Sequence, residues 1–151
     1  MRHIILIGFM GAGKTTVGRV LARDRGYAFF DTDRLIEEKT GMKVSRIFAE
    51  MGEETFRSLE TEIPGGDWTR EENWILSVGG GLPLREENRT LLKAIGTVVY
   101  LRVRPDTVID RLRGDTSRPL LAGDHVKERV EELMAYRSPL YEKAADFAVD
   151  A

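Results

Sequence analysis

The sequence predicts an α/β fold, in which helices pack on both faces of a parallel sheet. Five short, continuously apolar runs alternate along the chain with longer segments whose apolar residues recur at helical spacing. Strands buried on both faces are expected to show such runs, because neither face has to meet water. The expected strands are Ile4–Ile7, Ala28–Phe30, Trp74–Val78, Thr97–Leu101 and Phe147–Val149.

The segments between these strands carry apolar stripes that are typical of amphipathic helices. Pro105 suits the first turn of one helix, where its fixed φ is helical and its missing N–H would have no partner in any case. We expect each stripe to face the protein core. The stripes are Val17, Val20 and Leu21; Val44, Ile47, Phe48 and Met51; Val108, Ile109 and Leu112; and Val126, Val130, Leu133 and Met134.

A long helical stretch interrupts the alternation. Residues 33–63 contain helical patterns that are broken at Gly41 and Gly52, with no strand among them. They predict a helical region at about residues 33–62 beside the sheet.

A second interruption predicts a lid at about residues 112–124, because Gly114 and Gly123 bracket Arg118 and can absorb backbone rotation. Sheet, helical region and lid are expected to form a single domain over residues 1–151.

Composition excludes several classes of function. The chain has no cysteine, so it uses neither disulfides nor thiolate chemistry nor cysteine-ligated metals. The net charge is −2 without a block of Lys or Arg, which gives no indication of a nucleic-acid or membrane partner. No apolar run is long enough to span a membrane. We expect a cytoplasmic monomer that binds neither nucleic acid nor a membrane.

A glycine-rich loop directly follows the first expected strand. Residues 8–15 read Gly-Phe-Met-Gly-Ala-Gly-Lys-Thr and match the pattern G-x-x-x-x-G-K-[ST] between a strand and a helix. Inward-turned backbone N–H groups and the N-terminus of the next helix are expected to bind phosphate. Lys14 is expected to reach the β- and γ-phosphates, and the Thr15 hydroxyl to ligate Mg²⁺. The expected nucleotide-binding residues of this loop are Gly11, Ala12, Gly13, Lys14, Thr15 and Thr16.

A helical region and a lid around a phosphate-binding loop indicate a small-molecule kinase, which must hold an acceptor and exclude water from the nucleotide. Asp31 and Asp33 follow the second expected strand, and ligands gather at the carboxyl ends of parallel strands. Carboxylates there can orient Mg²⁺ through water or accept a proton from an attacking hydroxyl. One of the two aspartates could instead be only a helix N-cap.

Further residues are candidates for binding the acceptor. Arg57 and Glu60 can meet on one helix face, either as a solvated ion pair or as part of a site for an acidic substrate. Gly79–Gly81 end the third expected strand, where they allow close approach of a ligand or simply form a flexible turn. Position alone assigns no role to Arg118 or Arg137, because most arginines are solvated.

Six motifs are combined in one order along the chain. They are Gly-Phe-Met-Gly-Ala-Gly-Lys-Thr-Thr-Val-Gly at 8–18, Asp-Thr-Asp at 31–33, Phe-Arg-x-x-Glu at 56–60, Gly-Gly-Gly at 79–81, Arg-Pro-Leu-Leu at 118–121 and Tyr-Arg-x-x-Leu-Tyr at 136–141. Together they resemble the shikimate kinase family over nearly the whole chain. The resemblance implies a P-loop kinase fold with a five-stranded parallel sheet in order 2-3-1-4-5, flanked by helices. It also implies transfer of the γ-phosphate of ATP to the 3-hydroxyl of shikimate, with Mg²⁺, on the pathway to chorismate and the aromatic amino acids.

The resemblance further implies roles for individual residues. Asp33 would bind substrate hydroxyls and act as or orient the base, and Arg57 and Arg137 would hold the shikimate carboxylate. Arg111 would stack on adenine. The implied catalytic set is Lys14, Asp33 and Arg118; the substrate-binding set is Asp33, Arg57, Gly79, Gly80, Gly81 and Arg137; the nucleotide set adds Arg111 and Arg118 to the loop; and the metal set is Thr15 and, through water, Asp31.

Three rival functions share parts of this pattern. A regulatory GTPase would share residues 8–15, but the sequence has no Asn-Lys-x-Asp motif for guanine. A gluconate or nucleoside monophosphate kinase would share the core and lid without requiring the set of Asp33, Arg57, the three glycines and Arg137. A catalytically inactive ATP-binding module is disfavoured by the presence of Lys14, Asp33 and Arg118.

Overall fold

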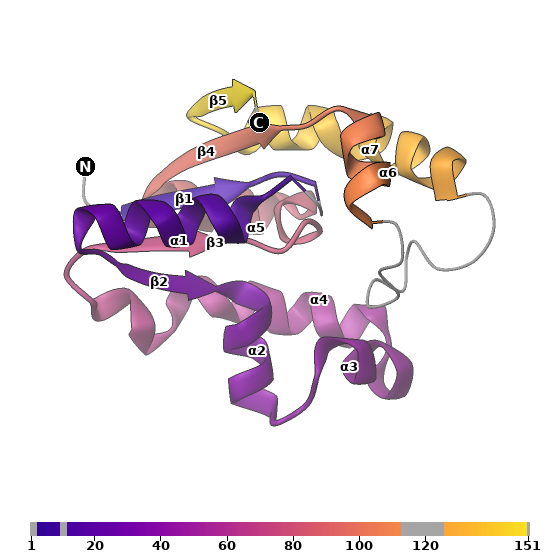
Figure 1. Cartoon of the computed structure of the whole chain (residues 1–151). Coiled ribbons are helices and arrows are strands. Elements are labelled where there is room, and N and C mark those ends of the chain that lie inside the picture. Colours follow the sequence, from indigo (N-terminus) through magenta and orange to yellow (C-terminus); the bar gives the residue numbers. More distant parts are fainter. Residues whose placement is uncertain (1–2, 10–11, 113–125, 151) are drawn as a thin grey trace.

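The computed structural model describes residues 3–9, 12–112 and 126–150, and a five-stranded sheet forms its centre. All neighbouring strands are parallel and the order is β2-β3-β1-β4-β5, which confirms the expected topology (Figure 1). The five expected strands are all present, with bounds that differ by one residue at some ends. They are β1 (His3–Ile7), β2 (Ala28–Asp31), β3 (Trp74–Ser77), β4 (Thr97–Arg102) and β5 (Phe147–Asp150).

Helices cover both faces of this sheet, with α1 on one face and α5 and α7 on the other (Figure 1). α6 begins at Pro105, as expected. No helix of the described ranges is long and apolar enough to cross a membrane. The α-helices are α1 (Lys14–Arg25), α2 (Thr32–Thr40), α3 (Val44–Met51), α4 (Glu53–Glu62), α5 (Glu86–Ile95), α6 (Pro105–Leu112) and α7 (Val126–Ala144), and the 3-10 helices are η1 (Ile63–Gly65), η2 (Asp67–Arg70) and η3 (Leu82–Leu84).

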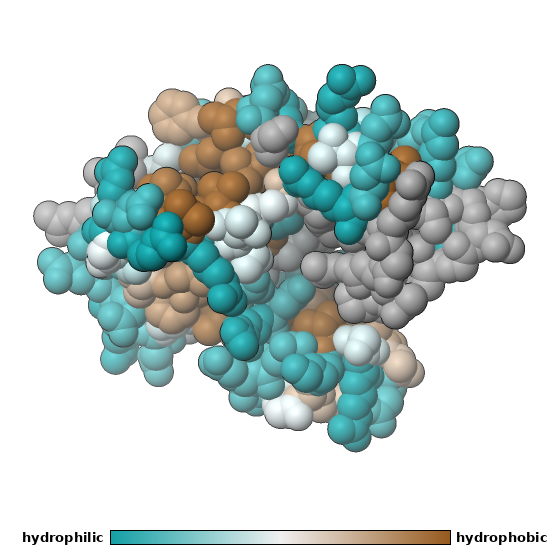
Figure 2. Space-filling view, viewed as in Figure 1, coloured by the Kyte–Doolittle hydropathy of each residue, from teal (hydrophilic) through white to brown (hydrophobic). Residues whose placement is uncertain are grey.

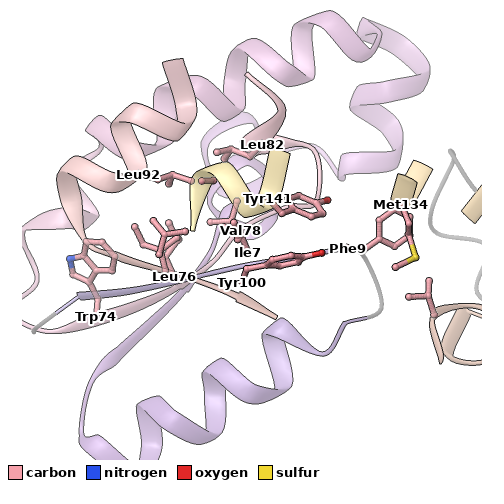
Figure 3. Packing of buried hydrophobic residues seen from close by; sticks show 14 of the residues in the cluster. Ile7, Phe9, Trp74, Leu76, Val78, Leu82, Leu92, Tyr100, Met134 and Tyr141 are labelled. Atoms are coloured by element: carbon pink, nitrogen blue, oxygen red, sulfur yellow. The ribbon is translucent and has the colours of Figure 1, made fainter. Parts of the chain in front are cut away.

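The largest core cluster lies between the sheet and the helices α5 and α7 (Figure 3). Ile5 and Ile7 of β1 point to this side, whereas Leu6 between them packs on the α1 side. Successive strand residues point to opposite faces, so a continuously apolar strand supplies both cores. Trp74 is 1% exposed and packs in the larger cluster.

The packing of α1 differs from the sequence prediction. Val17 and Val20 were expected to face the core, but they are 36% and 42% exposed. Gly18 and Ala22 form the buried face instead, and a Cβ atom at Gly18 would lie 2.6 Å from a ring carbon of Phe29. Small residues let the helix lie close to the sheet, and the valines then remain on its flank. Figure 2 shows apolar side chains gathered between α1 and the β4–β5 edge.

The expected helical region is formed by α2, α3 and α4. Gly41 ends α2 with φ 71° and Gly52 ends α3 with φ 86°, in the positive range that glycine adopts without strain. Ile36, Ile47 and Phe56 from the three helices form a separate core cluster. Met51 was expected on the same apolar stripe as Ile47, facing the core, but it is 47% exposed.

The order of the strands determines where in the sheet the expected site lies. β1 lies between β3 and β4, so the loop after β1 is flanked by the carboxyl ends of β3 and β4, with β2 next to β3. Ligands bind at such points in open parallel sheets. The expected lid residues 113–124 lie outside the described part of the chain.

Candidate active site

The loop between β1 and α1 has the backbone geometry that a phosphate-binding loop requires. Gly13 caps α1 in the left-handed conformation at φ 90°. Gly8 has φ 153°, and a Cβ atom there would lie 2.7 Å from the carbonyl oxygen of Leu101. Both positions therefore require glycine. Gly11, which the sequence also assigned to this loop, lies outside the described residues.

Lys14 is held against this loop. Its side chain is buried, and the ammonium donates hydrogen bonds to the carbonyl oxygens of Gly8 at 2.8 Å and Phe9 at 3.0 Å. A buried ammonium at the N-terminus of α1 gives the loop a positive charge beside its backbone N–H groups.

A cavity of about 200 Å³ opens at this end of the sheet. It joins the phosphate loop to the aspartates after β2 and the glycines after β3. Five of the six residues that the sequence assigned to nucleotide binding in the loop are described, and all but Ala12 line the cavity. The lining residues are Gly13, Lys14, Thr15, Thr16, Asp31, Asp33, Ser77, Val78, Gly79 and Gly80.

Asp31 has two partners at once. One oxygen, Oδ1, accepts a hydrogen bond from the backbone N–H of Asp33 at 2.9 Å and so caps the N-terminus of α2. The other, Oδ2, accepts one from the Thr15 hydroxyl at 3.1 Å. The capping interpretation of Asp31 is therefore correct, and the same side chain also lines the cavity beside Thr15.

Ser77 completes this group and was not identified from the sequence. Its Oγ lies 3.5 Å from the Thr15 Oγ1, and it pairs with Asp31 in the register of β2 and β3. Its place as the last residue of a central strand was the available signal. Thr15, Asp31 and Ser77 present oxygen atoms, which are the ligands that Mg²⁺ prefers.

Two carboxylates meet at Gly79. The Gly79 N–H donates to the Thr32 hydroxyl at 2.8 Å, which fixes the start of the glycine loop. A Cβ atom at Gly79 would lie 3.0 Å from the Asp33 Oδ1 and 3.1 Å from the Glu60 Oε2. The two oxygens are thus within about 6 Å of each other, because each lies about 3 Å from the same point.

Arg57 and Glu60 form a buried ion pair, so the solvated alternative is wrong. Their side chains are 12% and 1% exposed, and the Arg57 Nη1 donates to the Glu60 Oε1 at 2.8 Å. Burial raises the pKa of Glu60 to about 7, and the negative charge of Asp33 adds to this, while Arg57 and Arg137 oppose it. Glu60 was not assigned to the site from the sequence, which showed its spacing from Arg57 but not its burial.

Two arginines flank consecutive glycines of this loop. The Arg57 guanidinium lies against the Cα of Gly81, and the Nη1 of Arg137 would lie 3.3 Å from a Cβ atom at Gly80. Arg137 is 3% exposed, lies over the Phe9 ring and forms no ion pair within the described ranges.

The backbone N–H groups of Gly80 and Gly81 donate no hydrogen bond to any described residue. Two guanidinium groups therefore lie beside two glycines whose N–H groups have no partner among the described residues, an arrangement that can bind an anion with two oxygens.

Of the remaining expected residues, Arg111 on α6 lies close to the phosphate loop. Its Nη1 would be 3.5 Å from a Cβ atom at Gly13. Arg118 lies outside the described residues.

A parallel sheet in this order, with a glycine-rich loop before α1 and aspartates after β2, defines a P-loop phosphotransferase that acts on a small molecule. The comparisons with known proteins are more specific. A family model described as "Shikimate kinase" matches residues 10–151. The chain is 44% identical to the shikimate kinase of Thermodesulfovibrio yellowstonii, with 99% of this chain and 86% of that protein covered. It is 46% identical to the shikimate kinase of Methylococcus capsulatus, with 99% and 83% covered.

A solved structure agrees with these sequence matches. The shikimate kinase from Acinetobacter baumannii in complex with shikimate superimposes with a TM-score of 0.94 and 38% identity, covering 100% of this chain and 84% of that chain. The chain belongs to the shikimate kinase family.

Proposed function

We propose that this chain transfers the γ-phosphate of ATP to the 3-hydroxyl of shikimate and releases shikimate 3-phosphate and ADP. The observation that carries the proposal is the pair of arginines at Gly80 and Gly81, Arg137 buried and Arg57 largely buried, beside Asp33 and next to the phosphate loop. A P-loop kinase needs only the phosphate side of this arrangement. The arginine side fits an acceptor that carries a carboxylate.

Arg57 and Arg137 bind the shikimate carboxylate in this proposal. A planar guanidinium matches the two oxygens of a carboxylate with two parallel hydrogen bonds. Arg137 is buried without an ion pair in the described ranges, so a bound carboxylate would supply the charge that it lacks. Gly79, Gly80 and Gly81 line the same site and contribute backbone donors.

Asp33 binds the substrate hydroxyls and orients or deprotonates the one that attacks. It lines the cavity that also contains Lys14, so a hydroxyl at Asp33 can face a phosphate at the loop. Close placement of the two reactants accounts for much of the catalysis in phosphoryl transfer.

Nucleotide binding involves the loop residues 11–16, and Lys14 and Arg118 stabilise charge on the transferring phosphoryl group. Arg111 lies beside the loop and stacks on adenine in this proposal. Thr15 binds Mg²⁺ directly and Asp31 binds it through water. When bound, Mg²⁺ neutralises charge on the β- and γ-phosphates. No group of three His, Cys, Asp or Glu in the described ranges forms a metal cluster, which fits a metal that is held largely by the nucleotide.

ATP and shikimate are the proposed partners, and we propose that the protein acts as a cytoplasmic monomer. The test is ADP release with shikimate, gluconate, AMP and CMP as acceptors in parallel reactions. We expect turnover with shikimate to be at least about a hundredfold above turnover with the other acceptors. An acceptor that places no carboxylate at Arg57 and Arg137 lacks two charged hydrogen-bonded contacts. Comparable turnover with AMP or gluconate would contradict the proposal.

A further inference from the structure

One buried hydroxyl at the anion site has no role in the function proposed above. Tyr141 lies on α7, four residues after Arg137, and is 1% exposed. Its hydroxyl donates a hydrogen bond to the carbonyl oxygen of Gly80. The rest of the ring packs in the main core, where its centroid is 5.3 Å from that of Tyr100.

The same hydroxyl borders Arg137. A Cβ atom at Gly80 would lie 3.3 Å from the Arg137 Nη1 and 3.4 Å from the Tyr141 hydroxyl oxygen, so all three groups meet at one point. Burial raises the pKa of Tyr141 to about 12, and the charge and hydrogen bonding of Arg137 oppose this rise. The hydroxyl is therefore protonated at neutral pH and available as a donor. Arg137 and Tyr141 are four residues apart and so lie on the same face of α7.

The hydrogen bond to Gly80 also sets the direction of the next backbone donor. In a trans peptide the carbonyl oxygen and the following N–H point in opposite directions. The structure contains no cis peptide among the described residues. A fixed Gly80 carbonyl therefore fixes the Gly81 N–H to point away from Tyr141. A triple-glycine segment has little conformational preference of its own, so it depends on such external contacts.

We propose that Tyr141 is a positioning residue for the carboxylate site: through the Gly80 carbonyl and Arg137, its hydroxyl holds one backbone donor and one guanidinium in the arrangement that receives the carboxylate. This inference rests on the proposed role of that site. It assigns a function to the last residue of the Tyr-Arg-x-x-Leu-Tyr segment, and it makes α7 contribute both a ligand-binding cation and the group that orders its neighbours.

The test compares shikimate with its methyl ester, which has the same ring and hydroxyls but no carboxylate charge. Their dissociation constants are measured by titration calorimetry for wild type, Tyr141→Phe and Tyr100→Phe. The last is a matched control, since it removes a hydroxyl from the same cluster that makes no hydrogen bond to the described residues. We expect Tyr141→Phe to weaken shikimate binding about tenfold and ester binding less than about threefold. Tyr100→Phe should change neither.

Steady-state kinetics give a second readout. In Tyr141→Phe the KM for shikimate should rise with a smaller change in kcat and no change in the KM for ATP. Equal weakening of acid and ester binding, or no weakening, would overturn the role of Tyr141. A wild-type protein that binds acid and ester equally would instead overturn the proposed carboxylate site on which the inference rests.

A second variant keeps the test independent of how well Tyr141→Phe folds. Gly80→Ala retains the Tyr141 side chain and its hydroxyl group, but the added methyl displaces the hydroxyl or the Arg137 guanidinium by a few tenths of an ångström. We expect the same selective loss of shikimate binding relative to ester binding. If Gly80→Ala keeps the wild-type ratio of the two affinities, the proposed positioning by Tyr141 is wrong.

Discussion

At the scale of single residues, the site contains several buried or largely buried charged side chains, and each has a contact that stabilises its charge. Lys14 is stabilised by two loop carbonyls, Arg57 by Glu53 and Glu60, and Arg137 by the face of the Phe9 ring. Burial without a full counter-ion is costly, so such groups are usually retained for binding.

Replacing Lys14 with methionine should lower kcat about 10²- to 10³-fold, because the variant lacks the charge that we propose to stabilise the transferring phosphoryl group. Methionine keeps much of the side-chain volume. A coupled assay of ADP release measures the effect, and circular dichroism monitors folding, since the lost bonds to Gly8 and Phe9 also support the loop. Wild-type turnover in a folded variant would exclude this role for Lys14.

Glu60 should make the folded protein less stable as the pH rises, the opposite of the usual effect of a carboxylate. Its pKa is about 7 in the folded protein, compared with an ordinary value of 4.5. Between about pH 5 and 7 the folded protein keeps a proton that the unfolded chain has released, so this residue lowers the free energy of unfolding as the pH rises.

The measurement is thermal unfolding of wild type and Glu60→Gln between pH 5 and 8. Relative to the variant, wild type should lose stability with increasing pH, by at most about 3 kcal/mol over the whole interval. The variant is the internal control, because every other titrating group is shared. Parallel stability curves would show that Glu60 titrates normally.

At the scale of elements, α1 and α2 each have one residue that serves both the helix and its surroundings. Asp31 caps α2 while it accepts a hydrogen bond from Thr15 at the start of α1. Gly18 weakens α1 as a helix but permits its close packing on Phe29. Substitutions at Asp31 and Gly18 can therefore separate the effect of each residue on its own helix from its effect on the contacts of that helix with the rest of the protein.

Asp31→Asn should separate capping from metal binding. Asparagine is as good an N-cap as aspartate, so stability should stay within a few tenths of a kcal/mol of wild type, whereas Asp31→Ala should lose about 1 kcal/mol. Both variants should need more Mg²⁺ for half-maximal activity, because both lack the carboxylate charge. Urea unfolding and Mg²⁺ titration of activity measure the two effects. An unchanged Mg²⁺ requirement in Asp31→Asn would contradict the metal role.

Gly18→Ala should destabilise the protein by about 1–3 kcal/mol, although alanine is the better helix former. The added Cβ would lie 2.6 Å from the Phe29 ring, so the helix or the ring must move. Val17→Ala, at an exposed neighbouring position, is the control and should change stability by less than about 0.5 kcal/mol. Denaturant unfolding compares them, and a stabilised Gly18→Ala would mean that helix propensity outweighs the packing.

At the scale of the whole molecule, the strand order brings together residues that are far apart in the chain. Lys14 from α1, Asp33 from α2, Arg57 from α4 and Arg137 from α7 surround one end of the sheet. Ligands that bind only this assembled arrangement should stabilise the folded state as a whole.

Thermal unfolding with shikimate should therefore report on the acceptor side of the site, and thermal unfolding with ATP on the phosphate side. Shikimate at about a hundred times its wild-type Kd should add about 2.7 kcal/mol to wild type, and about 1.4 kcal/mol to an Arg57→Lys variant that binds it tenfold more weakly. An ammonium does not reproduce the bidentate hydrogen bonds of the guanidinium. ATP is the control and should stabilise both proteins equally. Equal stabilisation of both by shikimate would contradict the assignment of Arg57 to the acceptor.

The sequence by itself determined the features that depend on local order. The five apolar runs became the strands, the breaks at Gly41 and Gly52 separated the helices, and the motif at residues 8–15 became the loop with its glycine-specific conformations. Helical and extended periods, and the residues that interrupt them, are properties of neighbours along the chain. The resemblance to a family then supplied the strand order and most of the site residues.

Only the tertiary structure decided which distant groups meet and which surfaces are buried. It turned α1 so that Gly18 rather than Val17 faces the sheet, placed Ser77 beside Thr15, and buried Glu60 between Arg57 and Asp33. It also joined Tyr141 to Gly80 across 61 positions of sequence. Such contacts depend on how closely elements pack and on the order of the strands, and the spacing of residues along a chain carries neither.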